Sequence, residues 1–443
     1  MCEDLYGDGC MDNQRNEENK EETNKNFEFL KEIRKDRPIN KKRLLFKIIF
    51  TAGLAVIFGV VSCITFFALK PHVDQWLNPV ELEPVKIPQD QKEEDEPEQN
   101  PEPVVEQEPE PVIVEKVGLE LEDYVKLYDK LHQVVQKADS FLTTVTGLTE
   151  EVDWFQNTYP IQNQTTGVIV ADNGKELLIL ANQRALENAQ TILVEFCNGK
   201  EVEGIIKGYD GNTDLAIIGV NLDEIGEETM NALAKAQLGN SYSSSLDGLP
   251  TIAIGTFQGI SKSSAYGMIT SIHNQVRLAD TDLHLLSTDI NGGKDASGVL
   301  INYQGEVLGI IDSHFNGEDN NSLVAALSIS DLKGIIEKLS NGQGIAYLGI
   351  YGTDVPEQVH KDQGVPKGAY VTDVQMDSPA MNEGIQSGDV IIKIGTTNIT
   401  SFTDYKSNMS KRQPGDIAMI TVMRRGRNGY TELNYEITLS RLE

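Results

Sequence analysis

The residues most capable of chemistry lie in the segment Thr288–Ile310, which reads TDINGGKDASGVLINYQGEVLGI. A glycine-rich turn runs into an apolar stretch, and a Gly-Glu turn then precedes a second apolar stretch. A turn of this kind can present a serine, whose hydroxyl attacks a carbonyl carbon when a histidine takes its proton. Ser297 is the one serine of the segment and follows Ala296, while Lys294 and Asp295 stand where a flanking glycine would be expected. The segment therefore suggests nucleophilic chemistry but leaves its nucleophile in question.

The composition narrows the classes of protein to which this loop can belong. The chain has 443 residues and a formal net charge of −30, and its length allows two or three domains. Such an acidic chain is a poor partner for a nucleic-acid backbone, so nonspecific nucleic-acid binding is excluded. Its four cysteines do not suggest a disulfide framework, because Cys197 stands alone after a long apolar segment. We expect Cys197 to be an ordinary turn residue, and we expect no cofactor and no metal.

The N-terminal part of the chain has the pattern of a membrane anchor. Residues 1–43 form a polar tail that ends in a basic run, and the uncharged segment Ile48–Leu69 follows. At about 1.5 Å per residue this segment can cross roughly 30 Å of hydrocarbon, so we expect a transmembrane helix over 44–70. A cleaved signal peptide is the weaker alternative, because the apolar segment is long and far from the terminus. The basic run places the N-terminus in the cytoplasm and the main domains outside the membrane of a bacterial cell.

Two segments separate this anchor from the folded part of the chain. Residues 71–118 are rich in proline and glutamate, with eight of the sixteen prolines within 79–117, so we expect a stiff, extended spacer. Residues 119–139 follow a helical pattern. Apolar residues recur there at intervals of three and four, at Leu121, Tyr124, Tyr128, Leu131, Val135 and Ala138. This apolar seam either packs on the next domain or pairs chains as a short coiled coil.

Short strands dominate the rest of the chain. Over 140–335 apolar stretches alternate with Gly, Asn and Asp turns, for example in TTGVIVAD, TILVEF and TIAIGT. Frequent short strands of this kind indicate an all-β barrel or sandwich. The stretch SISDLKGIIEKLS then predicts a closing helix. Residues 345–443 form a third, mixed α/β block with a C-terminal hairpin around RRGRNGY.

The order of these pieces resembles that of the HtrA/Deg family of trypsin-like serine proteases that carry a C-terminal PDZ domain. The resemblance covers about 140–440 and is carried by LLILANQRAL, VEFCNGKEVEGIIKGYDGNTDLAIIGV, GVLINYQGEVLGI and KGAYVTDVQMDSPAMNEGIQSGDVIIKIGTTNITSF. It implies a mostly β architecture, with a trypsin-like double β-barrel over 140–340 and a mixed α/β PDZ domain over 341–443. It also implies peptides or unfolded proteins as partners, and a homotrimer.

The resemblance implies acyl transfer by a serine, a histidine and an aspartate. The segment TDLAII retains the aspartate as Asp214, whereas LANQRAL puts Arg184 at the position of the histidine. A guanidinium stays protonated and cannot act as a general base. We therefore predict that Arg184 and Asp214 form an ion pair in place of the histidine–aspartate hydrogen bond. The alternative is that Asp214 only caps a turn.

The position of the serine depends on the direction of counting, because the loop is one residue short. Counting forward from Thr288 gives Ser297, and counting backward from the better-matched strand gives Ala296, which we favour. Lys294 also replaces a glycine of the turn whose N–H groups would stabilise an oxyanion. His314 follows the next strand and is expected to be a loop residue rather than a base. The region 140–335 is thus expected to be a pseudoprotease.

The C-terminal block retains the parts with which PDZ domains bind. These domains add an extended peptide to an edge strand and receive its terminal carboxylate on backbone N–H groups of a glycine-containing loop. By resemblance this loop is YLGI, which comprises Tyr347, Leu348, Gly349 and Ile350. A helix over SFTDYKSNMSK would line the groove with Tyr405 and Met409, unless these two side chains belong to the core.

Together these features predict a membrane-anchored, extracytoplasmic HtrA-like pseudoprotease. It would bind peptides or unfolded segments, in envelope protein quality control or in the regulation of an active relative. The first alternative is an active serine endopeptidase that uses Ser297 with a distant base. The second is a structural tether whose peptide groove is vestigial.

Overall fold

The computed structural model describes residues 46, 49–50, 52–62, 65, 82–90, 120–152, 158–257, 260–293, 296–315 and 322–442. The tail 1–43, part of the expected membrane segment and most of the spacer therefore lie outside the described residues. Residues 52–62 are helical. Within the described ranges, no helix combines the length and the apolar character needed to span a membrane. The anchor accordingly stays a prediction, and the fold is described from residue 82 onward.

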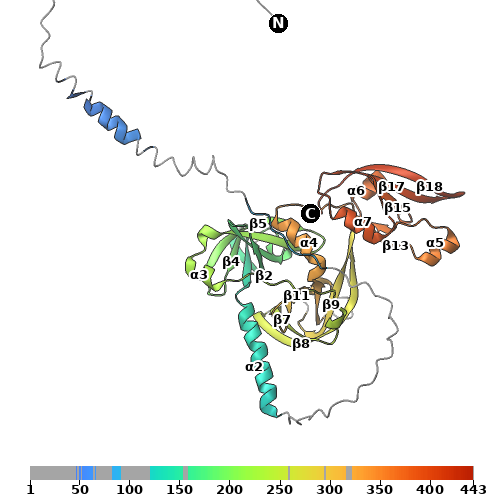
Figure 1. The fold of residues 1–443 in the computed structure, drawn as a ribbon, viewed down its shortest axis with the longest axis horizontal. Helices are drawn as coiled ribbons and strands as arrows, with labels where there is room; N and C mark the ends of the chain where they lie inside the picture. The colour runs from blue at the N-terminus through green and yellow to red at the C-terminus, as the bar shows by residue number, and fades with distance from the viewer. Residues whose placement is uncertain are drawn as a thin grey trace, which may run out of the picture. The chain divides into compact units, whose positions relative to one another are not determined.

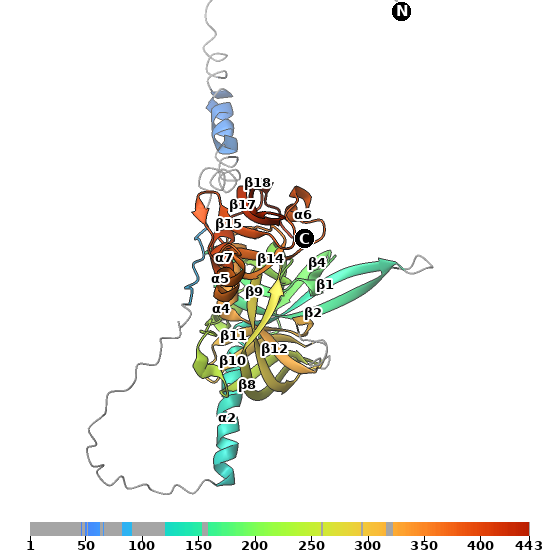
Figure 2. The ribbon, with the colours of Figure 1, turned by 90° about the vertical axis from the view of Figure 1, so that its right-hand side faces the viewer.

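The first half of the region 140–340 is a closed six-stranded barrel (Figure 1). Its strands are β1 (Leu142–Val152), β2 (Thr158–Asp172), β3 (Glu176–Asn182), β4 (Thr191–Glu195), β5 (Glu201–Asp210) and β6 (Leu215–Asn221). They pair antiparallel in the order β1-β2-β3-β6-β5-β4. The alternation in β4 puts every second side chain inside the barrel, whereas β3 and β6 are buried along nearly their whole length. β1 and β2 extend beyond the barrel as a long hairpin (Figure 2).

A second closed barrel follows in the order β10-β11-β12-β9-β8-β7. Its strands are β7 (Pro250–Phe257), β8 (Ile260–Leu278), β9 (Thr281–Asn291), β10 (Ser297–Asn302), β11 (Val307–Asp312) and β12 (Leu323–Ser328). The helix α4 (Ile329–Ser340) comes directly after β12 and buries Leu332, Ile336 and Leu339 in the core of the region. The predicted double barrel and its closing helix are therefore confirmed. The long strands β8 and β9 run from this barrel to the C-terminal domain (Figure 1).

Short helices connect the strands of the two barrels. They are η1 (Arg184–Leu186), η2 (Leu222–Glu224), α3 (Glu227–Ala232), η3 (Ser244–Leu246) and η4 (Ser313–Phe315). Two of them matter for the site. η1 begins two residues after the end of β3, and η4 directly follows β11, so both begin near the end of a barrel strand.

The C-terminal domain is an antiparallel sheet with three short helices, which agrees with the predicted mixed α/β block. Its elements are β13 (Ile350–Asp354), α5 (Glu357–Gln363), β14 (Ala369–Val374), α6 (Pro379–Glu383), β15 (Val390–Ile394), β16 (Thr397–Asn398), α7 (Phe402–Met409), β17 (Ile417–Gly426) and β18 (Gly429–Thr438). The sheet order is β13-β14-β15-β17-β18, with β16 paired to β15, so β13 lies at one edge. Inside, the buried Asp389 receives Arg424 in a two-contact ion pair at 2.6 and 2.7 Å. An uncompensated carboxylate would be costly at this depth.

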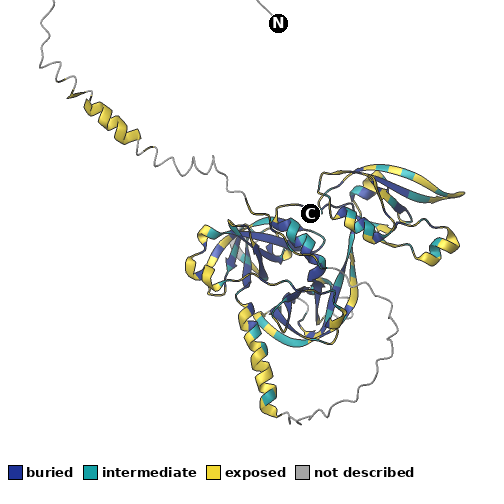
Figure 3. Cartoon of the chain, in the orientation of Figure 1, coloured by how far each residue is buried: buried dark blue, intermediate teal, exposed yellow. Residues whose placement is uncertain are grey.

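The predicted helix before the barrels is α2 (Leu121–Ala138). Its last turns bury Val135 and Ala138 in the barrel core, so the C-terminal end of the seam packs on the neighbouring domain. Toward the other end Leu121 is 76% exposed and Tyr124 is 58% exposed, and most of this helix is coloured as exposed (Figure 3). That exposed part leaves the pairing of chains as a prediction.

Part of the expected spacer is bound to the barrels. In residues 82–90 the Val85 N–H donates to Asn341 Oδ1 at 2.9 Å, and Asn341 Nδ2 donates back to the Val85 carbonyl at 2.9 Å. Asp90 Oδ2 lies 2.7 Å from Nζ of Lys333 on α4. A stiff free spacer was expected here. Its composition gave no sign that these nine residues form a strap along the helix.

Candidate functional site

Arg184 and Asp214 meet at one end of the first barrel, where β3 ends and β6 begins. η1 starts at Arg184, two residues after the end of β3 at Asn182, and Asp214 directly precedes β6. The backbone brings the two together, because the Gln183 N–H donates to the Asp214 carbonyl at 2.7 Å. The Asp214 φ of +54° suits an aspartate better than most residues. Arg184 Nη2 donates to the Asp214 carboxylate, so the predicted ion pair is confirmed.

The Asp214 carboxylate is partly buried among charges of both signs. Burial raises its pKa and is the largest effect; the charge of Arg184 lowers the pKa, and the neighbouring Asp312 carboxylate raises it. The net pKa is higher than usual. Because the Arg184 side chain is 44% exposed, solvent screens the pair in part. The guanidinium therefore partly neutralises the aspartate, but it takes no proton at neutral pH.

A hydrogen-bond chain joins this corner to the second barrel. Asn182 Oδ1 accepts from the Arg184 N–H at 2.9 Å, and Asn182 Nδ2 donates to Asp312 Oδ2 at 2.7 Å. Asp312 Oδ1 in turn accepts from the His314 N–H at 2.9 Å. Asn182 and Asp312 were not singled out from the sequence. Each is the last residue of a buried strand, which is the one signal that could have indicated a polar role.

Ala296 is packed inside the second barrel. It is 2% exposed and belongs to an apolar cluster with Phe257 and Val324. A Cβ on Gly292 would approach the Ala296 methyl group to 2.8 Å, so the two backbones lie close together. The Gly292 N–H donates to the Ser322 carbonyl at 2.8 Å, which ties the start of the loop to the strand beside it. At this position the side chain points into the core and carries no hydroxyl.

Ser297 is the other candidate nucleophile. It begins β10 and lies opposite Thr256 of β7 and Asp312 of β11. Among the described residues no histidine and no other group forms a hydrogen bond with its hydroxyl. His314 is exposed and follows Asp312 by two positions. The oxyanion turn around Lys294 lies outside the described residues, and the described part of the site offers a cation and a carboxylate but no proton acceptor bonded to Ser297.

In the C-terminal domain, backbone N–H groups of the predicted loop converge on one carboxylate, that of Asp280. The Leu348 and Gly349 N–H groups donate to Oδ2 at 2.7 and 2.8 Å, and the Ile350 N–H donates to Oδ1 at 3.1 Å. We call these three N–H groups the carboxylate cradle. Gly349 has a φ of +90°, and a Cβ there would lie 2.2 Å from Ser378 Cβ, so the loop needs glycine. Asp280 lies in the turn between β8 and β9, and no motif in that stretch of sequence singles it out.

The remaining predicted peptide-binding residues lie around the cradle. Tyr347 pairs with Ser440 through the backbone, with its N–H donating to the Ser440 carbonyl at 2.8 Å. Burial, with a further effect of the Asp280 charge, raises the pKa of Tyr347 to about 12. Tyr405 and Met409 are 0% and 4% exposed, so both are core residues of the domain. Tyr405 also serves the cradle, because its hydroxyl donates to Asp280 Oδ1 at 2.5 Å.

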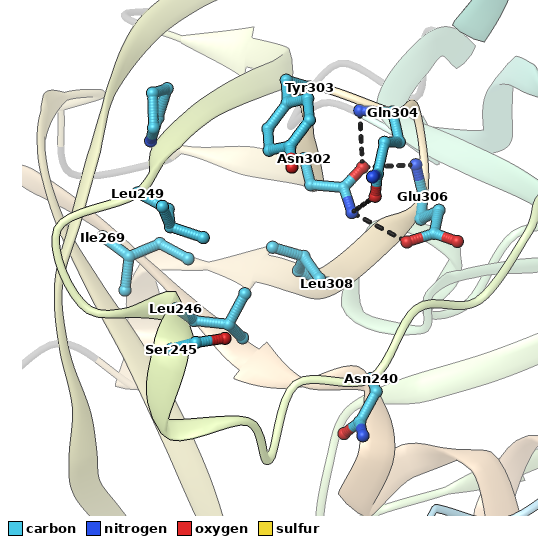
Figure 4. Close-up of a pocket in the computed structure, with 11 residues that line it drawn as sticks. Asn240, Ser245, Leu246, Leu249, Ile269, Asn302, Tyr303, Gln304, Glu306 and Leu308 are labelled. Atoms are coloured by element: carbon cyan, nitrogen blue, oxygen red, sulfur yellow. Dashed lines mark hydrogen bonds between the residues drawn. The ribbon is translucent and has the colours of Figure 1, made fainter. Parts of the chain in front are cut away.

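Two cavities lie outside the Arg184–Asp214 corner and the cradle, although one of them is lined by Gly255 and Thr256, the strand partners of Gly298 and Ser297. One, of about 220 Å³, is lined by Leu246, Leu308 and the polar turn 302–306, whose side chains bond to one another (Figure 4). The other, of about 390 Å³, lies between the barrels beside the end of α2 and includes the free, exposed Cys197. In the part of the chain that the structure describes, no group of three or more His, Cys, Asp or Glu could hold a metal ion.

The geometry defines a class of protein: a trypsin-like double barrel followed by a PDZ domain. Residues 165–310 match the trypsin-like peptidase domain family, and 346–435 match the PDZ domain family. The chain is 27% identical over 307 residues to serine protease Do-like HtrA of Lactococcus lactis subsp. cremoris (strain MG1363), covering 64% of this chain and 73% of that protein. It is 30% identical over 282 residues to serine protease Do-like HtrB of Bacillus subtilis (strain 168), covering 59% and 60%.

Solved structures agree on the fold. The structure described as the HtrA-type protease AlgW with decapeptide superposes with a TM-score of 0.50 at 20% identity, covering 71% of this chain and 99% of that chain. Identity this low supports the fold alone. The two domain matches, the relatives and the shared fold agree, and the chain belongs to the HtrA/Deg family.

Proposed function

We propose that this protein is an extracytoplasmic HtrA-like pseudoprotease that binds peptides or unfolded protein segments without cleaving them. The observation that carries the proposal is the ion pair of Arg184 with Asp214. In a serine protease of this fold, the aspartate orients a histidine that takes the proton of the serine. Here the aspartate is engaged by a group that cannot take a proton.

A second feature of the same site supports this proposal independently. Ala296, the favoured equivalent of the nucleophile, has no hydroxyl and faces the barrel core. Removing the base from a triad leaves a small residual rate, and removing the nucleophile as well leaves only binding and polarisation by the surrounding groups. An active endopeptidase that uses Ser297 is the second candidate, since Ser297 still carries a hydroxyl next to the expected position.

The PDZ domain supplies the proposed binding function. Its cradle directs three backbone N–H groups at one carboxylate, and the edge strand β13 begins at Ile350 within it. An extended peptide with a free C terminus fits such a site, because its main chain can add to the edge while its carboxylate enters the cradle. The decapeptide that accompanies AlgW in its solved structure is a ligand of the same chemical class.

The setting of this binding is part of the proposal. A helix over 44–70 would anchor the chain in the cell membrane and leave the two folded domains outside, where unfolded envelope proteins expose their termini. The exposed seam of α2 would pair chains, in keeping with a homotrimer. Protein quality control, or regulation of an active relative, is the role that fits a binder without cleavage.

A screen of peptides that differ in their C-terminal residues tests the binding function. We expect the purified protein to prefer certain C termini and to bind the amidated form of its best peptide at least about tenfold more weakly, because amidation removes the charge that the cradle receives. Fluorescence anisotropy measures both affinities. Equal affinity for the free acid and the amide, with no preference among sequences, would contradict the proposal and favour the structural tether.

A further inference from the structure

Asp280 makes both kinds of hydrogen bond that a peptide C terminus would make here, through its carboxylate and through its backbone N–H. Each oxygen of its carboxylate accepts two hydrogen bonds, Oδ2 from Leu348 and Gly349 and Oδ1 from Ile350 and the Tyr405 hydroxyl. Its own N–H donates to the Ile350 carbonyl at 2.7 Å. That bond is the one that the last residue of an added strand would make with the start of β13.

The turn that carries Asp280 is held in place from both sides. Beside it, Lys406 of α7 forms an ion pair with Asp282. From the first barrel, Asn212 Nδ2 donates to the Ala279 carbonyl at 2.9 Å. Asp280 is 7% exposed and has a φ of +64°, so the turn presents its side chain inward in a conformation that few other residues adopt as easily. The tip of the β8–β9 hairpin therefore occupies the cradle, and its conformation matches the positions of the donors.

A second carboxylate has no room in this arrangement. All four donors are engaged, and a peptide carboxylate within hydrogen-bond distance of the same N–H groups would lie next to the charge of Asp280. Like charges this close and this poorly solvated repel strongly. A peptide C terminus can enter only if Asp280 leaves.

We propose that Asp280 is an internal mimic of a C-terminal carboxylate, and that the β8–β9 hairpin and the C terminus of a bound peptide compete for one cradle. The inference rests on the proposed peptide-binding function. The partner is a chain with a free terminal carboxylate, and its binding undocks the hairpin tip. The apparent affinity for such a peptide is reduced by the fraction of molecules in which Asp280 occupies the cradle.

Two substitutions empty the cradle without requiring a new backbone conformation. Asp280→Asn keeps the shape and tolerates the positive φ, but it removes the charge and turns one acceptor into a donor that faces N–H groups. Asp280→Gly also tolerates the positive φ and removes the side chain. Asp282→Asn is the matched control, because it removes the same charge two residues away together with the partly exposed ion pair to Lys406, while the Asp280 carboxylate keeps its own four hydrogen bonds.

Amide hydrogen exchange in the full-length protein without peptide tests the occupancy. We expect the amides of Leu348, Gly349 and Ile350 to exchange about tenfold faster or more in Asp280→Gly, which removes both acceptor oxygens, and to a smaller extent in Asp280→Asn, which keeps one of them. In Asp282→Asn they should stay within about threefold of the wild-type rates. Unchanged exchange in both Asp280 variants would overturn the inference.

Affinity for a fluorescent peptide with a free C terminus tests the competition in the same proteins. We expect it to rise about tenfold in both Asp280 variants and much less in Asp282→Asn, while the amidated peptide gains nothing. Faster exchange with no gain in the affinity of a peptide that wild type already binds would overturn the competition. If the amides exchange faster and no variant binds either form of the peptide, the proposed peptide-binding function fails while the occupancy by Asp280 stands.

Discussion

Arg184 changes the chemistry of its corner while keeping the corner charged and ordered. A neutral side chain there would leave the part-buried Asp214 with Asp312 as a neighbouring charge and with no cation on η1. The arginine supplies a counter-charge and its N–H is fixed by Asn182. Arg184 therefore keeps the charges of this corner balanced, and under the proposal it does so without supplying the base on which hydrolysis depends.

The ion pair makes a prediction about stability and pH. Arg184→Leu should raise the pKa of Asp214 further, because the group that lowers it is removed. At pH values well above the pKa of Asp214, where its carboxylate is ionised, the variant should lose about 1 kcal/mol of unfolding free energy. A carboxyl whose pKa is raised by folding favours the folded state only when protonated, so the loss should shrink as the pH falls through the folded pKa. Urea unfolding at several pH values measures it.

Asp214→Asn provides the control for that experiment. In this background there is no charge for Arg184 to neutralise, so Arg184→Leu should cost little and its cost should not depend on pH. The double-mutant cycle then isolates the interaction of the two charges. A pH-independent loss of the same size in both backgrounds would mean that Arg184 contributes only packing.

For single residues, the sequence predicts contacts between neighbouring or recognisable stretches and misses contacts that form only when distant stretches fold together. Arg184 could be identified because one strand end carries it in a recognisable stretch, and its pairing with Asp214 follows from charge. Asn182 and Asp312 lie 130 positions apart and meet only when both barrels are folded. Neither stretch of sequence contains a pattern that indicates contact with the other. Asp280 is missed for the same reason, since its partners follow it by about seventy positions.

At the level of chain segments, the strap 82–90 and the β8–β9 hairpin both form contacts outside their own part of the chain. Barrel strands are predictable because alternating side chains and turn residues are properties of short stretches. The attachment of a proline-rich segment to a helix cannot be predicted in this way, because it depends on which donors and acceptors α4 exposes. The contacts of the strap include the ion pair of Asp90 with Lys333, two hydrogen bonds between Val85 and Asn341, and the Ile87 N–H, which donates to Glu337 Oε2 at 2.9 Å.

The ion pair of the strap gives the second prediction. The Lys333 side chain is 4% exposed, and Asp90 is bonded to it. Asp90→Asn should leave this buried ammonium without its carboxylate, and the strap should detach so that water can reach the lysine. We expect trypsin to cut after Lys86 about tenfold faster in the variant, because detachment exposes the backbone more often.

Glu83→Gln is the matched control for the strap. Glu83 is exposed and lies in the same segment, and its substitution removes one carboxylate as well. Cleavage after Lys86 should then proceed near the wild-type rate. Equal acceleration in both variants would show that net charge, rather than the contact with Lys333, holds the strap.

Over the whole molecule, the proposal combines an intact protease fold that has lost its reacting groups with a PDZ domain that has kept its binding groups. Both barrels are closed and their cores are filled, so the proposed loss of catalytic groups at Arg184 and Ala296 would not be a loss of fold. The cradle in the PDZ domain is complete down to the glycine that its loop requires. This combination is what a protein that holds peptides without cutting them needs.

The most direct test of this account is the hydrolysis of casein by the purified protein, compared with its Ser297→Ala variant. We predict no hydrolysis above the protein-free blank for either one, because no base is bonded to Ser297 among the described residues and because, under the proposal, Arg184 takes the position of the histidine. Steady hydrolysis by the wild-type protein that disappears in Ser297→Ala would contradict the account.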